Sequence, residues 1–421
     1  MTLCALTLLC SLRGISTRLR FAQSMAMPWR SVAALTAFLL IWFVPVGASA
    51  GQSIGLGQAA AGRVDLCGAI DADTTWTPDN LYVITCEVTV AKGVTLTVMP
   101  GTIVKALYGN YTPCSVTVFG RLVAEGTPEA PIVFTSIKDD EHGGDTNADG
   151  SATVPGPGNW QSINFEAGSS GRISNALIAY GGYWYFYDNP ALVRCNDADI
   201  KLDRVTLRAG SLAGLSARRC SVEFTNGTMA DNGSGLQVFG LADGVPSTFA
   251  NNVFGPGPAG VVHFDGNPHG PVSIHDNVAL GGKTGLNLRG TLKGDLDWHN
   301  DALVLLMVEG LTVAPEATLR LAPGSVVKSD LSSGPGGAIE VNGILLAEGT
   351  PAAPIVFTSI RDDEHGGDTN ADGSNTTPGP GQWSAVTVNA GGRAHIAHAE
   401  MLYGGNYSFF GSSGNRVGRK Q

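Results

Sequence analysis

Two copies of an acidic loop carry the residues whose types and spacing are best suited to chemistry. In each copy, side-chain oxygens occupy alternate positions and a glycine follows the third of them. The residues are Asp145, Asn147 and Asp149 in the first copy, and Asp368, Asn370 and Asp372 in the second. Oxygens at this spacing converge on one hard cation, and calcium accepts them at roughly 2.3 to 2.6 Å. We therefore expect a Ca²⁺ site in each copy.

These loops are not complete EF-hands, because Gly156 and Gly379 stand where the bidentate glutamate of an EF-hand would be. The remaining ligands would come from Asp139, Asp140, Glu141, waters or main-chain carbonyls, so we expect the weak affinity of extracellular sites. The alternative is an acidic, glycine-rich surface loop whose charges are solvated. Retention of the oxygens in both copies favours calcium, although a recent duplication would leave the same pattern.

His142 and His365 follow these carboxylates and bring metal or acid-base chemistry into consideration. A histidine followed by two glycines in a flexible loop is more commonly solvent-exposed and idle. We assign neither histidine a zinc-binding or catalytic role.

Aromatic residues gather in two further segments. They are Tyr180, Tyr183, Trp184, Tyr185, Phe186 and Tyr187 in the first, and Tyr403, Tyr407, Phe409 and Phe410 in the second. Exposed rings stack on the faces of sugars, whereas buried rings pack a loop against the protein. The segments suggest a carbohydrate-binding patch, with packing as the alternative.

The elements that must position these residues follow from an internal duplication. The segment GTPEAPIVFTSIKDDEHGGDTNADGS begins at Gly126 and recurs with two differences from Gly349, 223 positions later. The same shift relates Lys105 to Lys328 and Trp160 to Trp383. Apolar residues alternate within each copy, which predicts short strands with one buried face.

A second periodicity lies between the copies, where Phe224, Phe249 and Ile274 are 25 residues apart. A repeat of this length without a helical pattern is typical of one turn of a solenoid, in which each coil covers the next. A polar series follows two residues after each member: Asn226, Asn251 and Asp276. We expect these side chains to stack at a turn and to bond to the main chain of adjacent coils. An immunoglobulin-like sandwich would lack the fixed register.

With this coil periodicity over residues 200–290 and the block G-T-x-x-x-P-I-x-F-T-S at 126–136 and 349–359, the chain resembles the secreted bacterial pectin-lyase-like proteins. The resemblance covers residues 76–405. It implies an all-β fold, a right-handed parallel β-helix solenoid with coils of about 22–25 residues. The block is typical of large β-helix surface proteins and carries little information about chemistry.

The resemblance also raises polysaccharide cleavage, for which a lyase needs calcium-binding carboxylates and a nearby Arg or Lys base. The candidates are Asp197, Asp199, Asp203 and Arg204, with Arg208 and Arg219 as further basic residues. A glycosidase would instead need two acids roughly 5 to 9.5 Å apart. No complete motif of either kind is present, and we interpret these charges as the outer face of coils whose inner face holds Ile200 and Leu202. No catalytic residue is assigned with confidence.

A leader precedes the solenoid. Arginines precede the apolar run 32–46, and Ala48-Ser49-Ala50 follows it, so residues 1–50 are interpreted as a signal peptide with its true start at Met25 or Met27. The run is shorter than a membrane span, and no span is expected after cleavage. The expected divisions are 51–75 as N-terminal linker or cap, 76–190 as the first block, 191–297 as central coils, 298–406 as the second block and 407–421 as a polar tail. No cap is evident in the tail, and we expect a truncated solenoid.

Five cysteines follow the leader, and an oxidising compartment allows them to pair. We expect disulfides between Cys67 and Cys86 and between Cys195 and Cys220, with Cys114 left as a free thiol or as the partner of a missing group. No C-x-x-C pattern is present, which argues against a structural zinc site.

Composition limits the function further. The formal net charge is −10, with 57 glycines and only 15% charged residues, so a nucleic-acid partner is not expected. The sequence therefore predicts a secreted or cell-surface β-helix scaffold or adhesion protein, calcium-stabilised and without evident catalysis, whose side surface binds an extracellular polysaccharide or cell-surface polymer. The alternative is a polysaccharide lyase or glycoside hydrolase on the same fold.

Overall fold

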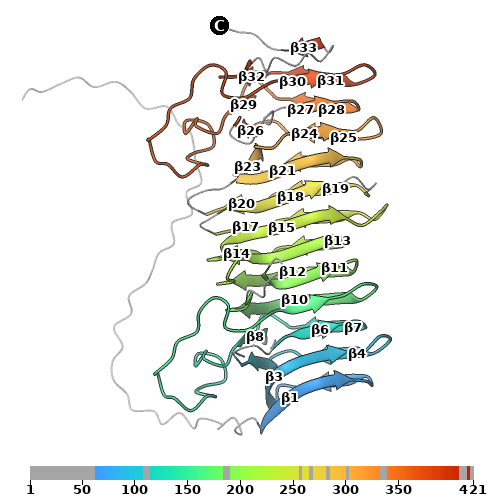
Figure 1. Ribbon diagram of the computed structural model, residues 1–421, viewed down its shortest axis with the longest axis vertical. Coiled ribbons are helices and arrows are strands. Elements are labelled where there is room, and N and C mark those ends of the chain that lie inside the picture. Colours follow the sequence, from blue (N-terminus) through green and yellow to red (C-terminus); the bar gives the residue numbers. More distant parts are fainter. Residues whose placement is uncertain are drawn as a thin grey trace, which may run out of the picture. The chain divides into compact units, whose positions relative to one another are not determined.

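The computed structural model describes residues 62–107, 114–183, 190–255, 258–264, 269–280, 285–299, 303–331, 339–406 and 415–417. Every regular element in these residues is a β-strand, and the strands of successive coils pair in parallel (Figure 1). The predicted parallel β-helix is confirmed. The predicted signal peptide at 1–50 and most of the predicted tail at 407–421 lie outside the described residues.

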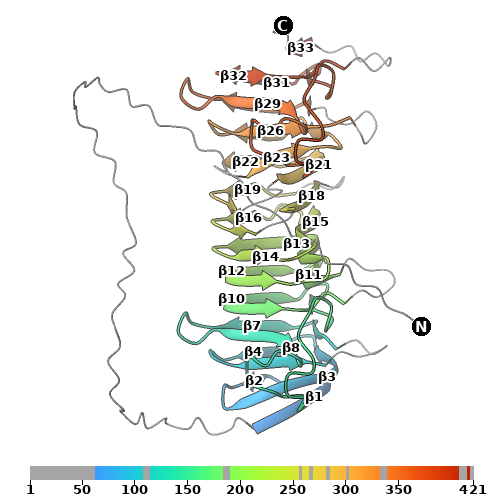
Figure 2. The same cartoon turned by 90° about the vertical axis from the view of Figure 1, so that its left-hand side faces the viewer.

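One face of the solenoid is continuous through the described coils. Leading into one another by parallel pairing, its strands are β2 (Thr74–Trp76), β4 (Thr95–Val98), β7 (Arg121–Glu125), β10 (Ser170–Ala179), β12 (Asp199–Arg208), β13 (Ala213–Thr225), β16 (Ser247–Ala250), β19 (Val272–His275), β22 (Leu296–His299), β25 (Thr318–Leu321), β28 (Ile344–Glu348) and β31 (Arg393–Ala397). Figure 2 shows these strands as successive rungs.

A second face carries the strands from which the acidic loops depart. Its members are β1 (Gly62–Ile70), β3 (Asn80–Val90), β5 (Ile103–Ala106), β8 (Ile132–Ser136), the later parts of β10 and β12, β14 (Thr228–Ala230), β17 (Val253–Phe254), β20 (Val278–Ala279), and in the second block β23 (Val304–Met307), β26 (Val326–Ser329), β29 (Ile355–Ser359) and β32 (Ala399–Met401).

The third face is formed by the ends of β1 and β3, by β6 (Val116–Val118), β9 (Ile163–Phe165), β11 (Ala191–Asn196), the start of β13, β15 (Ser234–Leu241), β18 (Gly260–Phe264), β21 (Gly285–Leu292), β24 (Leu311–Val313), β27 (Ile339–Val341), β30 (Val386–Val388) and β33 (Asn415–Val417). The β30–β33 pair is antiparallel, so the segment predicted as a polar tail contributes a short strand.

The core is a column of apolar side chains stacked coil upon coil. On the continuous face, register places Leu202, Phe224, Phe249, Ile274 and Trp298 one above another, each with at most 1% of its surface exposed. The 25-residue series found in the sequence is part of this ladder. Each fully buried side chain of this kind contributes roughly 1.5–3 kcal/mol, which stabilises neighbouring coils mutually.

The predicted polar ladder is wrong by one residue. Asn252 and Asn277 are the buried amides that stack: Asn252 Nδ2 donates to Asn277 Oδ1 at 3.0 Å and to the Phe224 carbonyl at 2.8 Å. Asn251 instead occupies the preceding corner with φ of 56°, a left-handed conformation that asparagine tolerates. The corner and ladder positions are adjacent, and both favour polar residues.

Strand β1 begins at Gly62, inside the segment 51–75 predicted as linker or cap, and pairs with β3 in the parallel register of later coils. Cys67 is disulfide-bonded to Cys86 across this pair, and Cys195 is bonded to Cys220 across β11 and β13. Cys114 is a buried free thiol. In the described part of the chain, no helix is long and apolar enough to cross a membrane.

Candidate functional site

Each acidic loop is an insertion between equivalent strands, at 137–162 between β8 and β9 and at 360–385 between β29 and β30. Both loops leave the coils on the same side of the solenoid (Figure 1). The two loops share their sequence, their points of attachment and their fold, so each interaction in one loop can be compared with its counterpart in the other.

A buried lysine fixes the base of each loop to the coils. Lys105, on β5, has no exposed surface, and its Nζ donates to the carbonyl oxygens of Asp139 and Gly144 at 2.7 and 2.6 Å and to Thr146 Oγ1 at 2.7 Å. Three acceptors satisfy the three protons of the ammonium group, which makes burial of the charge tolerable. The lysine therefore holds the first turn of the loop against the coils.

The second loop repeats this anchor with a variation. Lys328 Nζ donates to the carbonyl oxygens of Asp362 and Gly367 at 2.6 and 2.5 Å. The Oγ1 atom of Thr369, which corresponds to Thr146, is buried without a hydrogen-bond partner in the described residues. Burial lowers the pKa of Lys328 to about 8, although Asp362 and other loop carboxylates oppose this shift.

Asp139 is a structural residue of the first loop, and it is 2% exposed. Its Oδ2 accepts from Thr135 Oγ1 at 2.6 Å and lies 2.8 Å from Nδ1 of His142, while Oδ1 accepts from the Glu141 main-chain N–H at 3.1 Å. Asp362 makes the equivalent contacts in the second loop. Ligand atoms of Asp139 lie within 4.8 Å of those of Glu141 and His142, apart from the group formed by the other carboxylates of the loop.

Asp140, the next residue, joins the predicted calcium ligands instead. Oxygens of Asp140, Asp145 and Asp149 all lie within 4.8 Å of one another, and those of Asp363, Asp368 and Asp372 do the same in the second loop. We name each cluster, together with the asparagine of its loop, an oxygen cradle.

Hydrogen bonds fix the shape of the first cradle. Both oxygens of Asp145 accept main-chain N–H groups, from Asp149 at 3.1 Å and from Gly150 at 2.8 Å. Asn147 turns its amide nitrogen toward Asp149 Oδ2 at 2.8 Å, and Thr153 donates to the same oxygen at 2.5 Å. These contacts use Oδ2 of Asp149 and Nδ2 of Asn147. They leave Oδ1 of Asp149 and Oδ1 of Asn147 without a hydrogen-bond donor in the described residues.

The free oxygens are buried. Asp140 Oδ1, Asn147 Oδ1 and Asp149 Oδ1 have no hydrogen-bond donor in the described residues, and the corresponding atoms of Asp363, Asn370 and Asp372 have none either. A buried oxygen without a donor costs about 1–3 kcal/mol. Two loops that each leave the same three oxygens unpaired have the donor set of a hard cation such as calcium.

Electrostatics in the second cradle agree with this donor set. Burial raises the pKa of Asp363, and the nearby carboxylates of Asp368 and Asp372 raise it further, while Lys328 opposes them. Crowded carboxylates repel each other unless a cation is among them.

A groove lies beside the first loop, over β8, β10 and β12, with a cavity volume of about 490 Å³. Glu141 and His142 form its wall, while Arg204, Thr206 and Arg208 come from β12. The buried carboxylate of Asp139 holds Nδ1 of His142, whose side chain is 28% exposed. Arg204 was a predicted catalytic candidate, but sequence analysis did not connect it with His142, far away in the chain.

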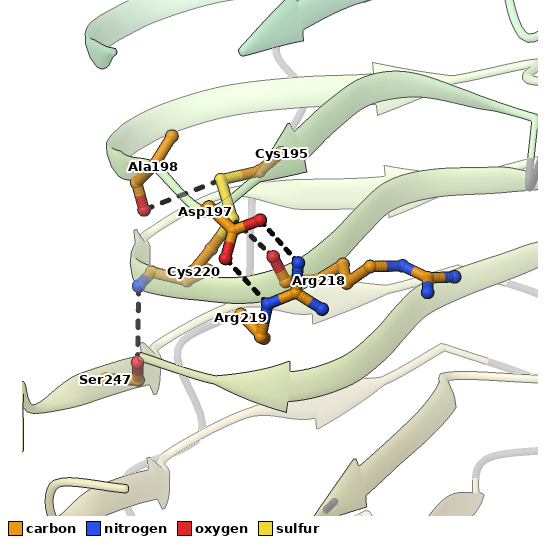
Figure 3. The surroundings of a disulfide bond; sticks show 8 residues. Cys195, Asp197, Ala198, Arg218, Arg219, Cys220 and Ser247 are labelled. Carbon is orange, nitrogen blue, oxygen red and sulfur yellow. Dashed lines mark hydrogen bonds and ion pairs between the residues drawn. A yellow bond between two sulfur atoms is a disulfide. The ribbon is translucent and has the colours of Figure 1, made fainter. Parts of the chain in front are cut away.

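The other predicted catalytic candidates do not gather around Arg204. Asp197 is bound to Arg219 through two hydrogen bonds of 2.6 Å at a corner of the coil, beside the Cys195–Cys220 disulfide (Figure 3). Hydrogen bonding from Arg219 holds the pKa of Asp197 below its usual value. Six residues on, within β12, Asp203 pairs with Arg204 at 2.7 Å. The predicted acid cluster is therefore two separate surface ion pairs.

Asp199 is exposed between these pairs, and the inward residues Ile200 and Leu202 are buried as expected. Among the aromatic residues, Tyr180 has the Arg208 guanidinium carbon over its ring, 5.9 Å from the ring centroid. Residues 184–187 and the aromatic residues from Tyr407 onward lie outside the described residues. Sequence analysis missed the role of Lys105, although the duplication repeats this residue as Lys328 at a constant shift.

Stacked parallel coils with two equivalent loops define a β-helix protein. Its first block, residues 68–190, matches the family model of the pectate-lyase-like beta helix domain, and this part of the chain is similar to that domain. The matched segment includes the first oxygen cradle, Lys105 and the loop wall of the groove. Comparison with curated proteins and with solved structures gave no match.

Proposed function

We propose that this protein is a secreted or cell-surface β-helix scaffold, stabilised by calcium at its two loops, that binds an extracellular polysaccharide. The observation that carries the proposal is the pair of oxygen cradles, each with the same three buried oxygens unpaired. Calcium would be held by Asp140, Asp145, Asn147 and Asp149 in the first loop and by Asp363, Asp368, Asn370 and Asp372 in the second. The ion would supply the missing electrostatic partner and order each loop.

Polymer binding is supported by the regular side of the solenoid. Both loops project on one side, and eight steps of the continuous face separate β7 from β28. At the usual strand spacing of about 4.8 Å, the two loops are roughly 38 Å apart, a distance that a polymer of several sugars spans. A repeating ligand that contacts several points of such a surface gains affinity through multivalency.

The experiment that tests this function combines binding and cleavage in one assay. The purified protein is incubated with acidic and neutral polysaccharides, with calcium or with a chelator, and both bound polymer and newly formed reducing or unsaturated ends are followed. Binding without new ends is expected. Failure to retain any polymer in the presence of calcium would contradict the proposed function.

A second candidate, polysaccharide cleavage, is favoured by one observation. His142 is held by buried Asp139 in the manner of an oriented base, and it faces the same groove as Arg204 and Arg208. The same assay distinguishes the candidates, because calcium-dependent formation of new ends that is lost in His142→Ala would establish an enzyme. Retained activity in His142→Ala would exclude this residue as the base.

A further inference from the structure

The first acidic loop lies against three successive coils, which we call the first, second and third coils after their strands β1, β3 and β5. Gly143, at φ of 75°, packs over the second and third coils, because a β-carbon added to it would lie 3.1 Å from Leu81 Cδ1 and 3.6 Å from Ile103 Cδ1. Arg63, on the first coil, donates from Nη1 to the main-chain carbonyl of Thr146 at 3.2 Å. The loop therefore reaches back across three coils (Figure 1).

Thr146 joins the first coil to the third. Its main-chain carbonyl accepts the bond from Arg63, and its Oγ1 accepts from Lys105 Nζ at 2.7 Å. In the sequence it stands between Asp145 and Asn147, two of the residues proposed to hold calcium. A cation held by both of these neighbours would fix the main chain at Thr146, and with it the positions of both acceptors.

The first coil buries little of its surface. Strand β1 pairs in parallel with β3, and the Cys67–Cys86 disulfide links the same two strands. None of the nine residues of β1 is buried. Segments with few buried apolar contacts open at a lower free energy than core strands. The contact from Arg63 to the loop therefore holds a strand that is otherwise easily opened.

The second block differs at both ends of this bridge, although its loop keeps the cradle residues. Thr369 corresponds to Thr146, and its Oγ1 has no hydrogen-bond partner in the described residues. The position of Arg63 corresponds to Leu286, which is fully buried and cannot donate a hydrogen bond from its side chain. In the described residues, both blocks therefore have the cradle, and the first block has the bridge between coils.

We propose that Thr146 is a calcium-dependent clasp: calcium in the first cradle fixes Thr146, closes the first loop on the first and third coils, and so controls how readily β1 opens. This inference rests on the calcium sites of the proposed function and adds a regulatory role for one of them. The second cradle orders its own loop without controlling a coil in this way. Removal of calcium releases the first coil while the rest of the solenoid stays folded.

The test is hydrogen exchange of the full, disulfide-bonded chain, followed by mass spectrometry, with a chelator or with calcium at about ten times its dissociation constant. At this concentration a single site can slow exchange from the open state by at most about elevenfold, and we expect a slowing of about threefold to tenfold in residues 62–70. Asp149→Ala should abolish the slowing, whereas Asp372→Ala, which removes the second site, should leave it unchanged.

A variant on the first coil separates the clasp from calcium binding itself. Arg63→Met removes the donor to Thr146, so the chain should still bind calcium at two sites, but calcium should no longer slow exchange in residues 62–70. Asp65→Asn is the matched control, because it removes the ion pair of Arg63 and keeps the donor to the loop. It should show the same slowing as the wild type.

A variant within the loop tests the other end of the clasp. Thr146→Val keeps the shape of the side chain and removes the acceptor of Lys105, so it should reduce the slowing about twofold or more. Thr369→Val makes the same change in the second loop, where the hydroxyl has no partner in the described residues. It should leave exchange in residues 62–70 unchanged.

The possible failures are distinguishable. If calorimetry shows no calcium binding to the wild type, the calcium sites of the proposed function fail and the clasp fails with them. If two calcium ions bind but exchange in residues 62–70 is the same with calcium and with chelator, the clasp fails while the calcium sites stand. Slowing that persists in Arg63→Met would show that calcium reaches the first coil by another route, and would overturn the bridge through Thr146.

Discussion

The ammonium nitrogen of Lys105 donates a 2.7 Å hydrogen bond to the main-chain carbonyl of Asp139, and Lys328 makes the same contact with Asp362 at 2.6 Å. In both blocks a charge buried in the coils therefore holds the first turn of an acidic loop. The next residue of each turn, Asp140 or Asp363, belongs to an oxygen cradle, so the lysine positions the cradle through one peptide unit.

Lys105→Met tests this anchor. The variant leaves the carbonyls of Asp139 and Gly144 without their donor, and we expect a loss of about 1–3 kcal/mol in local stability because the loop can turn these groups toward water. Hydrogen exchange should accelerate in residues 137–162 and remain unchanged in 360–385, which serve as the internal control. Equal protection of both loops in the variant would show that Lys105 does not hold the loop.

The two oxygen cradles predict a defined stoichiometry of calcium binding. Titration calorimetry should give two sites per chain, one after Asp149→Ala and none after Asp149→Ala with Asp372→Ala. The dissociation constants should be in the range of extracellular sites, about 10⁻⁴–10⁻³ M. The melting temperature should rise with calcium in the wild type and not in the double variant.

Asp199→Ala is the control for calcium binding, because it removes an exposed carboxylate of β12 outside both cradles. It should keep two sites. A wild type whose melting temperature is unchanged by calcium would contradict the assignment of the cradles.

The amide ladder makes a separate prediction about stability. Asn252→Ala removes the donor to the Phe224 carbonyl and the acceptor of the Gly227 N–H, both buried, and should lower the free energy of unfolding by about 2–4 kcal/mol. Its neighbour Asn251 is exposed and at positive φ, where glycine is equally comfortable, so Asn251→Gly should change stability by less than about 0.5 kcal/mol. Similar urea midpoints for the two variants would refute the ladder.

Cys114 offers a test by pH and alkylation. Burial raises the pKa of its thiol, and the thiolate is the reactive species, so little of it forms at pH 8. Iodoacetamide should label Cys114 slowly in the native protein and rapidly in guanidinium, as quantified by peptide mass spectrometry. Because a raised pKa moves thiolate formation to higher pH, native labelling should increase as the pH passes above the usual thiol range. Fast native labelling at pH 8 would be incompatible with this environment.

Calcium and polymer binding should be coupled if both proposals hold. Asp140 is a cradle residue, while Glu141 and His142 form the wall of the groove, so one short turn serves both sites. Chelation should weaken binding of the polysaccharide, and the polysaccharide should increase calcium affinity by the same factor. Asp149→Ala should weaken polymer binding, whereas Asp372→Ala, in the second loop, should not.

The repeat and its register determine the fold. Alternating apolar residues at a spacing of 25 can all be buried only when each coil covers the next, so the ladder through Phe224, Phe249 and Ile274 was predictable. The duplication likewise identified both acidic loops and most of their oxygens. Both features are local or periodic in the sequence, and a chain without helical patterning has few other ways to bury its apolar residues.

Tertiary structure decided which of two adjacent polar residues performs each role. Residues 251 and 252 are both asparagine, but the corner conformation at Asn251 turns only Asn252 inward. Asp139 and Asp140 are identical carboxylates, yet Thr135 and His142 occupy the first and leave the second to the cradle.

The groove could not be predicted from the sequence, because its walls meet only when the coils stack. Because Asp197, Asp199 and Asp203 are close in sequence, they were candidates for one site. In the structure, Asp197 pairs with Arg219 and Asp203 pairs with Arg204, so the carboxylates belong to separate ion pairs. Coil stacking instead brings Arg204 and Arg208 of β12 beside His142 of an earlier loop. The residue pattern determined the coils and their repeated loops, and the way one coil lies upon another determined which side chains meet.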